Sequence, residues 1–174
     1  MKFIELLCQR RSIRDYKKEK ISKEVLDEII MAGLLSPSGR NIQSTSFVAV
    51  DDKEVLAALS EARVCSAQML NHASAAIIVI GDTSKSDVWI EDACITMTNM
   101  QLNATDLGAG SCWIQIRNRD SVKNNSSSIF IKELLNIPDN YEVEAILSLG
   151  IIKDPKKPHL RSEADLKRVH YNKY

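Results

Sequence analysis

Residues 75–81 constrain the fold of this chain more than any other segment. They read Ala-Ala-Ile-Ile-Val-Ile-Gly, an uninterrupted apolar run that is rich in β-branched side chains. A run of this kind predicts a strand that is buried on both faces. Such a strand needs other elements packed against each side, so we expect a layered domain in which helices cover a sheet.

Helical and strand patterns alternate along the rest of the chain. The apolar spacing predicts a helix to about Gln9, a second helix that begins at the N-cap Ser22, and a third that is capped by Asp51-Asp52. The longest helical pattern is 88–107, and its wide apolar face is typical of a core or interface helix that Gly108 and Gly110 would end. The remaining predictions are a short helix at 129–135 and strands at 47–50, 111–116 and 143–152.

Composition excludes several classes of partner. The 174 residues fit one domain spanning 1–174, with no repeat or linker. Lys+Arg and Asp+Glu number 23 each, and a net charge of zero disfavours nucleic acid or an anionic membrane as a bulk partner. No apolar run is long enough to span a bilayer, and charged residues interrupt the N-terminal apolar stretch, so we expect a cytoplasmic protein.

The four cysteines are widely separated. Cys8, Cys65, Cys94 and Cys112 form no Cys-x-x-Cys pair, and no histidine stands at ligand spacing from them. We therefore expect buried reduced thiols and no metal site. Two further segments have little apolar character: 117–128, predicted to be a mobile loop, and the tail from Asp154.

Two polar clusters are candidates for a binding site. The first is the arginine-rich stretch Arg10, Arg11, Ser12 and Arg14. Guanidinium groups suit a phosphate or a delocalised anion, although a solvated helix end would have the same composition. The second is the loop 36–43, with Pro37, Ser38, Asn41 and Gln43. Its amides can donate and accept at the edge of a heterocycle, although turns use the same residues. Together the clusters predict a site for a flat, phosphorylated ligand such as a flavin.

These motifs resemble the nitroreductase family of FMN-dependent oxidoreductases. The resemblance runs in family order through five landmarks that cover nearly the whole chain: Arg10-Arg11-Ser12-x-Arg14, Ser36-Pro37-Ser38-x-x-Asn41-x-Gln43, Gly110-Ser111-Cys112-Trp113-Ile114, Ile146-Leu147-Ser148-Leu149-Gly150, and Arg161. It implies an α+β fold with a mixed central β-sheet flanked by helices, in an intertwined homodimer that holds FMN at its interface. By contrast, Gly108-Ala109-Gly110 follows a helix and lacks a third glycine, so a Rossmann phosphate site is excluded.

The same resemblance implies a role for each matching residue. Arg10, Arg11, Ser12 and Arg14 would hold the FMN phosphate and the N1/C2 edge of the ring, and Arg161 would join the phosphate site. The loop with Pro37, Ser38, Asn41 and Gln43 would come from the other subunit and cap the flavin. Ser44-Thr45 replaces the Pro-Trp that is common in the family. The backbone at Leu149 and Gly150 would approach the ring and offer an amide to N5, because glycine has no Cβ.

The implied activity is hydride transfer from NADH or NADPH, through bound FMN, to a nitroaromatic, a quinone or a similar acceptor in a ping-pong cycle. No catalytic side chain is expected, since flavin N5 carries the chemistry. Two alternatives stay open: a specialised flavin enzyme that acts on a single metabolite, and a non-catalytic FMN-binding sensor or storage protein. The sequence does not choose the acceptor or the donor.

Overall fold

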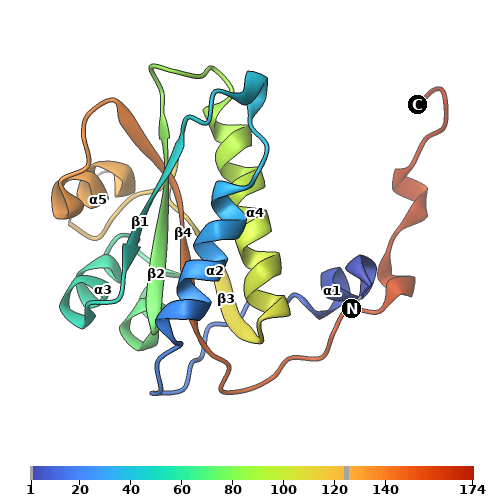
Figure 1. Ribbon diagram of the computed structural model, residues 1–174, viewed down its shortest axis with the longest axis horizontal. Coiled ribbons are helices and arrows are strands. Elements are labelled where there is room, and N and C mark those ends of the chain that lie inside the picture. Colours follow the sequence, from blue (N-terminus) through green and yellow to red (C-terminus); the bar gives the residue numbers. More distant parts are fainter. Residues whose placement is uncertain (1, 124–125) are drawn as a thin grey trace.

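The computed structural model describes residues 2–123 and 126–174 and has the α+β architecture expected from the sequence (Figure 1). Its sheet has the order β1-β2-β4-β3, formed by β1 (Thr45–Val50), β2 (Ala75–Asp82), β4 (Tyr141–Ile151) and β3 (Ala109–Gln115). All three strand pairs are antiparallel. Among the described residues the one parallel pairing is an isolated bridge between Ser12 and Ser111, at the β3 edge.

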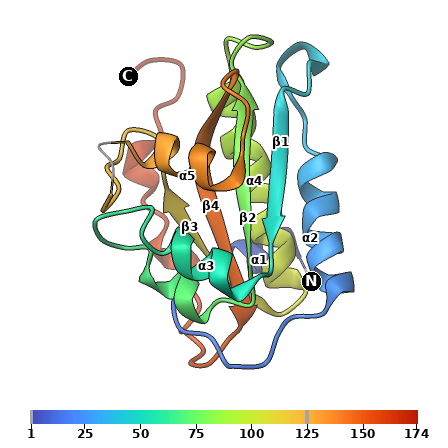
Figure 2. The ribbon, with the colours of Figure 1, turned by 90° about the vertical axis from the view of Figure 1, so that its left-hand side faces the viewer.

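Helices cover both faces of this sheet. The helices α2 (Lys23–Leu34) and α4 (Trp89–Asp106) lie on one face, and α3 (Lys53–Leu59) and α5 (Ser127–Leu135) lie on the other (Figures 1 and 2). Strand β2 is buried along its whole length. Its Ile77 and Val79 pack in the α2/α4 layer, and Ile78 and Ile80 pack in the α3 and α5 layer. The strand buried on both faces is therefore confirmed.

The helix ends follow the expected chemistry with one exception. The Ser22 hydroxyl accepts a hydrogen bond from the Val25 amide, and the Asp52 carboxylate caps α3. Gly108 has φ +74° just after α4, a conformation that glycine adopts without strain. Gly110 does not end that helix, because it already lies inside β3 and pairs with Gly150.

The segment predicted as a mobile loop, 117–128, is partly ordered by hydrogen bonds. The Val64 amide donates to the Asp120 carbonyl, and the Val122 amide donates to the Glu61 carbonyl. The segment also ends earlier than expected, because α5 begins at Ser127. Positions 124–125 of the predicted loop lie outside the described residues.

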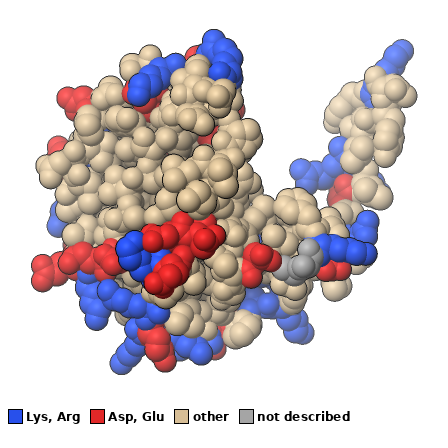
Figure 3. Space-filling model, in the orientation of Figure 1, with Lys and Arg blue, Asp and Glu red and all other residues tan. Residues whose placement is uncertain are grey.

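The helix α1 (Phe3–Gln9) and the tail 154–174 form an extension that we call the terminal arm. The α1 helix has no buried residue, and the tail is exposed throughout. The His159 amide donates to the Cys8 carbonyl at 2.8 Å, and the Arg11 guanidinium donates to the Lys157 carbonyl. Figure 3 shows the end of the tail standing apart from the main body across an open gap, whereas α1 contacts α4.

The apolar face of α4 is used within this chain. Met97, Met100 and Ala104 are fully buried against α2 and the sheet. The wide apolar stripe of 88–107 is therefore a core feature of this chain, which is one of the two roles that its pattern predicts. The large apolar side chains exposed elsewhere include Phe3, Ile4 and Leu7 on α1, Met31, Leu34 and Leu35 at the end of α2, and Ile95 on α4. Within the described residues, no helix combines the length and apolar character needed to cross a membrane.

Candidate functional site

The segment 10–16 lies on a pair of facing glycines. Gly110 in β3 is paired with Gly150 in β4. A Cβ on Gly110 would lie 2.9 Å from Ile13 Cγ2, and a Cβ on Gly150 would lie 2.6 Å from Tyr16 Cδ1. These distances are too short for a real methyl group, so both glycines are needed for the segment to lie flat on the sheet. We call this pair the glycine platform.

Tyr16 fastens the end of the segment to the platform. Its side chain is only 4% exposed. The hydroxyl donates to the Ile13 carbonyl at 2.8 Å and shares a hydrogen bond of 2.7 Å with Ser148 Oγ. Burial raises the pKa of Tyr16 above its ordinary value, so the phenol stays neutral and acts as a hydrogen-bonding anchor.

Ser12, Arg10 and Arg14 come together around Cys112. The Ile13 amide donates to the Ser111 carbonyl at 2.9 Å, which places Ser12 beside β3. Burial raises the pKa of the Cys112 thiol, while the charge of Arg14, a hydrogen bond with Ser12 and the charge of Arg10 act in the opposite direction. The structure thus brings three of the predicted site residues to one place.

The two guanidinium groups beside Cys112 have capacity for a ligand. Neither Arg10 nor Arg14 forms an ion pair with any residue that the structure describes. Arg14 is exposed and Arg10 is half-buried. Unpaired guanidinium groups beside a serine hydroxyl are a donor set that fits a phosphate group. The residues present therefore fit the phosphorylated cofactor that the sequence predicts.

Arg11 and Arg161 belong to the terminal arm. Arg11 donates to the Lys157 carbonyl, so part of its donor capacity holds the tail against α1. Its charge also contributes to lowering the pKa of Glu163, although the hydrogen bond from His159 is the larger cause. Arg161 is exposed in the short 3-10 helix Arg161–Glu163, close to this contact. The tail is thereby brought to the arginine-rich end of the chain.

Leu149 and Gly150 are more enclosed than a ligand-facing backbone. Leu149 is fully buried, and the Tyr16 ring covers Gly150. Position 150 requires glycine because the Tyr16 side chain packs directly against its backbone. The amide contact to a flavin ring remains a prediction.

The loop 37–43 presents polar groups to the solvent. Pro37, Asn41 and Gln43 are exposed, and Ser38 is half-buried. The Ser38 hydroxyl accepts a hydrogen bond from the Gln43 amide at 3.0 Å. Asn41 and Gln43 have φ of 55° and 52°, so both residues adopt the left-handed backbone conformation and the loop turns tightly.

A buried carboxylate anchors this loop. The Gly39 amide donates to Asp92 Oδ1 at 2.8 Å, and Asp92 is only 3% exposed. Its other oxygen, Oδ2, is buried and has no hydrogen-bond partner in the described part of the chain. The loop is therefore fixed to the first turn of α4.

The two clusters lie at opposite ends of α4. Gly39 contacts Val88 and Asp92 at the start of this helix, whereas Ser12 pairs with Ser111, a few residues beyond its end. The helix has 18 residues and so spans about 27 Å. Both ribbon views show the same separation (Figures 1 and 2). One chain does not assemble the arginines and the loop amides into a single site.

Sequence reasoning missed the residues that position the site. Tyr16 is an aromatic residue among charged neighbours, and an aromatic side chain in such a stretch could have indicated a buried contact. Asp92 is a carboxylate within the apolar pattern of a long helix, which is a recognisable signal for a specific partner. Gly110 was interpreted as a helix end, and Ser148 carried no signal of its own.

Comparison with known proteins gives consistent matches. Residues 7–69 and 57–151 match the model of one family, described as "Nitroreductase family". A protein from Archaeoglobus fulgidus named "Putative NADH dehydrogenase/NAD(P)H nitroreductase" is 37% identical over 179 residues, covering 98% of each chain. A shorter stretch of 53 residues, 30% of this chain, is 42% identical to 18% of iodotyrosine deiodinase 1 from Sus scrofa. Among solved structures, an FMN-dependent nitroreductase from Clostridium difficile R20291 has a TM-score of 0.95 at 45% identity, covering 98% of this chain and 99% of that one.

Proposed function

This chain belongs to the nitroreductase family, and from that premise we propose that it uses NADH or NADPH to reduce a nitroaromatic, a quinone or a similar small acceptor. It is an NAD(P)H-dependent oxidoreductase with FMN as its cofactor, as the family and the FMN-dependent neighbour indicate. FMN, when bound, supplies hydride acceptance at N5, so no catalytic side chain is required. The proposed order is ping-pong, with the oxidised donor leaving before the acceptor enters.

The observation that carries this proposal is the unpaired Arg10/Arg14 pair beside Ser12. These side chains would bind the cofactor phosphate and place positive charge near the N1/C2 edge of the ring. Positive charge at that edge favours the reduced, anionic ring and raises its reduction potential. The glycine platform and Tyr16 would fix the backbone that carries these arginines, so that only their side chains need to become ordered on binding.

We propose that the complete site forms between two copies of the chain. In this arrangement the loop with Ser38, Asn41 and Gln43 of one subunit caps the FMN that is held by the arginines of the other. The separation of the two clusters along α4 supports the proposal. The exposed apolar side chains of α2 and of the terminal arm also support it, because patches of this kind are uncommon in monomers. A closed two-fold homodimer would use each surface twice and create two equivalent sites.

Flavin retention tests the arginine assignment. Arg14→Ala and Arg10→Ala should each weaken FMN binding by about 10- to 150-fold, the equivalent of losing a charge-assisted hydrogen bond of about 1.5–3 kcal/mol. Arg40→Ala is the matched control, because Arg40 is exposed and paired with Asp87. Flavin absorbance after dialysis is the measurement. Equal retention in all three variants would refute the assignment.

Subunit complementation tests the shared site. The protein should have a mass of about 39 kDa, twice the 19.5 kDa of one chain, in light scattering. Mixing Arg14→Ala subunits with Asn41→Ala subunits should restore one intact site in each heterodimer after exchange. A monomer that retains FMN, or no recovery after exchange has been shown, would contradict the proposal.

Turnover distinguishes the enzyme from a sensor or storage protein. We expect steady oxidation of NADH or NADPH that depends on an added quinone or nitroaromatic. The second candidate is a specialised flavin enzyme that acts on one metabolite, and the local similarity to iodotyrosine deiodinase 1 favours including halogenated tyrosines in the acceptor screen. Activity confined to one such compound would favour this candidate. A cytoplasmic location is part of the same proposal, since the donor is a cytoplasmic nucleotide.

A further inference from the structure

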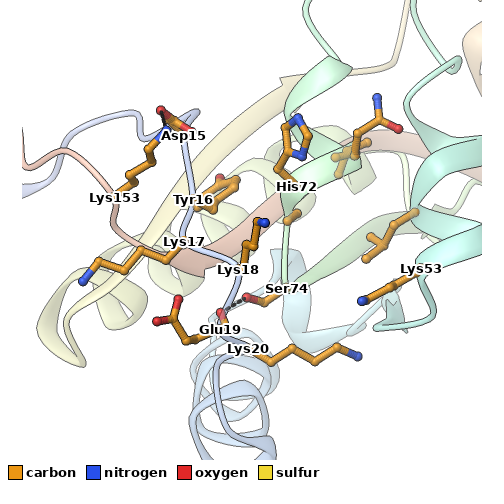
Figure 4. A pocket seen from close by; sticks show the side chains of 14 residues that line it. Asp15, Tyr16, Lys17, Lys18, Glu19, Lys20, Lys53, His72, Ser74 and Lys153 are labelled. Atoms are coloured by element: carbon orange, nitrogen blue, oxygen red, sulfur yellow. Dashed lines mark hydrogen bonds and ion pairs between the residues drawn. The ribbon is translucent and has the colours of Figure 1, made fainter.

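A cavity of about 790 Å³ lies beside the candidate flavin site, on the outer side of Tyr16. It is open to solvent and is lined by the segment 15–20, the first turns of α3, the short 3-10 helix Gln68–His72 and Ser74 (Figure 4). Tyr16 lines this cavity and also covers Gly150. The volume lies within the usual range of about 300–1,000 Å³ for small-molecule sites.

The residues that line the cavity carry a net positive charge, although the net charge of the whole chain is zero. Its lining includes Lys17, Lys18, Lys20, Lys53 and Lys153 against Asp15 and Glu19, five positive and two negative charges, which leaves a net +3. The chain as a whole has a net charge of zero. This concentration of one sign in a hollow favours an anionic ligand, because field lines are focused there.

Three of these five lysines form neither an ion pair nor a side-chain hydrogen bond with a described residue, and two of the three face the hollow. Lys153 is paired with Asp15 at 3.1 Å, and Lys20 Nζ donates to the Asp51 carbonyl. Lys17, Lys18 and Lys53 have no ion-pair partner among residues 2–123 and 126–174, and the Lys17 side chain extends away from the other two (Figure 4).

The nearby acidic groups leave that binding position open. Figure 4 shows Lys18, Lys53 and His72 around the same hollow, and the Glu19 carboxylate on the side of Lys17, away from Lys53. Beside Lys53, Asp52 Oδ1 already accepts hydrogen bonds from the amides of Glu54 and Val55.

The inner wall of the cavity is apolar. Leu56, Leu70 and the Tyr16 ring form its buried base, and the carbon stems of the lining lysines add accessible apolar surface above them. A bare inorganic ion would make no use of this wall. We propose that the cavity binds a phosphorylated small organic molecule, with phosphate between Lys18, Lys53 and His72 and the organic part against the lysine stems above the buried base. This site is separate from the Arg10/Arg14 cluster and does not depend on the proposed redox function.

Calorimetric titration of the purified holoprotein tests this proposal with two ligands, pyrophosphate and adenosine 2′,5′-bisphosphate. We expect both to bind, with the nucleotide several-fold tighter because of the apolar wall. The Lys18→Ala/Lys53→Ala variant should bind each at least about tenfold more weakly, since two charge-assisted contacts are lost. Lys23→Ala is the control for loss of charge nearby, because Lys23 lies outside the lining and is paired with Asp27. Its affinities should match those of the unchanged protein.

Three outcomes would overturn the proposal: no binding of either ligand, equal weakening in Lys23→Ala, or equal affinity for the two ligands. Binding to the Arg14→Ala variant is a further test. If that variant loses pyrophosphate binding, the anion occupies the flavin site and the cavity is not its position. Flavin content is measured separately, so a failure of the FMN assignment is distinguishable from a failure here.

The KM values for NADPH and NADH show whether the phosphate that binds in the cavity belongs to NADPH or to another molecule. If the ligand is the 2′-phosphate half of NADPH, the KM for NADPH should rise in Lys18→Ala/Lys53→Ala while the KM for NADH is unchanged. If both values are unchanged while nucleotide binding is lost, the ligand is a separate phosphorylated molecule. Either result supports a phosphate site in the cavity.

Discussion

Replacing Gly150 with alanine should disturb both stability and cofactor binding through Tyr16. The new Cβ would lie 2.6, 2.7 and 2.9 Å from Tyr16 Cδ1, Cγ and Cβ. Rotation of the ring cannot relieve the contact with Tyr16 Cβ, so the backbone of the segment must lift from β4. Overpacking of this kind costs about 1–3 kcal/mol. If the Tyr16 hydroxyl also loses its bonds to the Ile13 carbonyl and Ser148 Oγ, two buried hydrogen bonds add about 1–3 kcal/mol. We expect a total loss of about 2–6 kcal/mol in the free energy of unfolding.

The assay combines urea unfolding with flavin retention after dialysis. Gly108→Ala is the matched control, because Gly108 has φ +74° and no atom within 4 Å of a new Cβ. That control should lose only about 1 kcal/mol, from backbone strain, and should keep its flavin. Adding Gly150→Ala to a Tyr16→Gly protein should cost little more than Tyr16→Gly alone, because Tyr16→Gly removes all three clashing atoms, Cβ included. The reasoning is refuted if Gly150→Ala behaves like Gly108→Ala, or if the two changes are additive.

Other positions give independent tests. Asp92→Ala should remove the anchor of the Gly39 amide, speed its hydrogen exchange, and lower FMN retention while the Arg14 site is intact, because the capping loop is loosened. The hydrogen bond from Ser84 lowers the pKa of Asp82 to about 2, below its unfolded value of about 3.9. The ionised Asp82 therefore stabilises the folded protein above pH 4, and this stabilisation is lost as the pH falls towards 2. The Asp82→Asn variant has no such group to protonate, so its urea midpoint should drop less between pH 5 and pH 3 than that of the unchanged protein. Burial raises the pKa of Cys112, so peptide mapping after thiol labelling at pH 8 should find it the slowest of the four cysteines until the protein unfolds.

Local signals predicted most of the fold. The continuous apolar run at 75–81 identified the buried strand, and the cap residues Ser22 and Asp52 identified helix starts to within a residue. These features depend on a few neighbouring residues, so a single sequence contains them. Gly110 was misassigned because its role depends on Gly150, Ile13 and the antiparallel register of β3 and β4, which are distant in sequence.

The candidate site was predictable in part for the same reason. Guanidinium groups at Arg10 and Arg14 indicate an anion from their chemistry alone, and the structure places them together around Cys112. The position of the loop around Asn41 at the other end of α4 depends on packing across the whole domain. The apolar stripe of 88–107 indicated burial correctly, but a pattern cannot tell whether the covering surface is this chain or a second copy. Here α2 and the sheet cover it.

The terminal arm has a consequence for biosynthesis. With seven residues and none of them buried, α1 is too short to be stable as an isolated helix. The His159 amide, which donates to the Cys8 carbonyl of α1, and the Lys157 carbonyl, which accepts from Arg11 just after this helix, both come from the other end of the chain. At 5–20 residues per second, these partners leave the ribosome roughly 7–30 s after α1 does. The α1 segment is therefore completed only after its distant partners have been synthesised, and until then the apolar Phe3, Ile4 and Leu7 are accessible to chaperones.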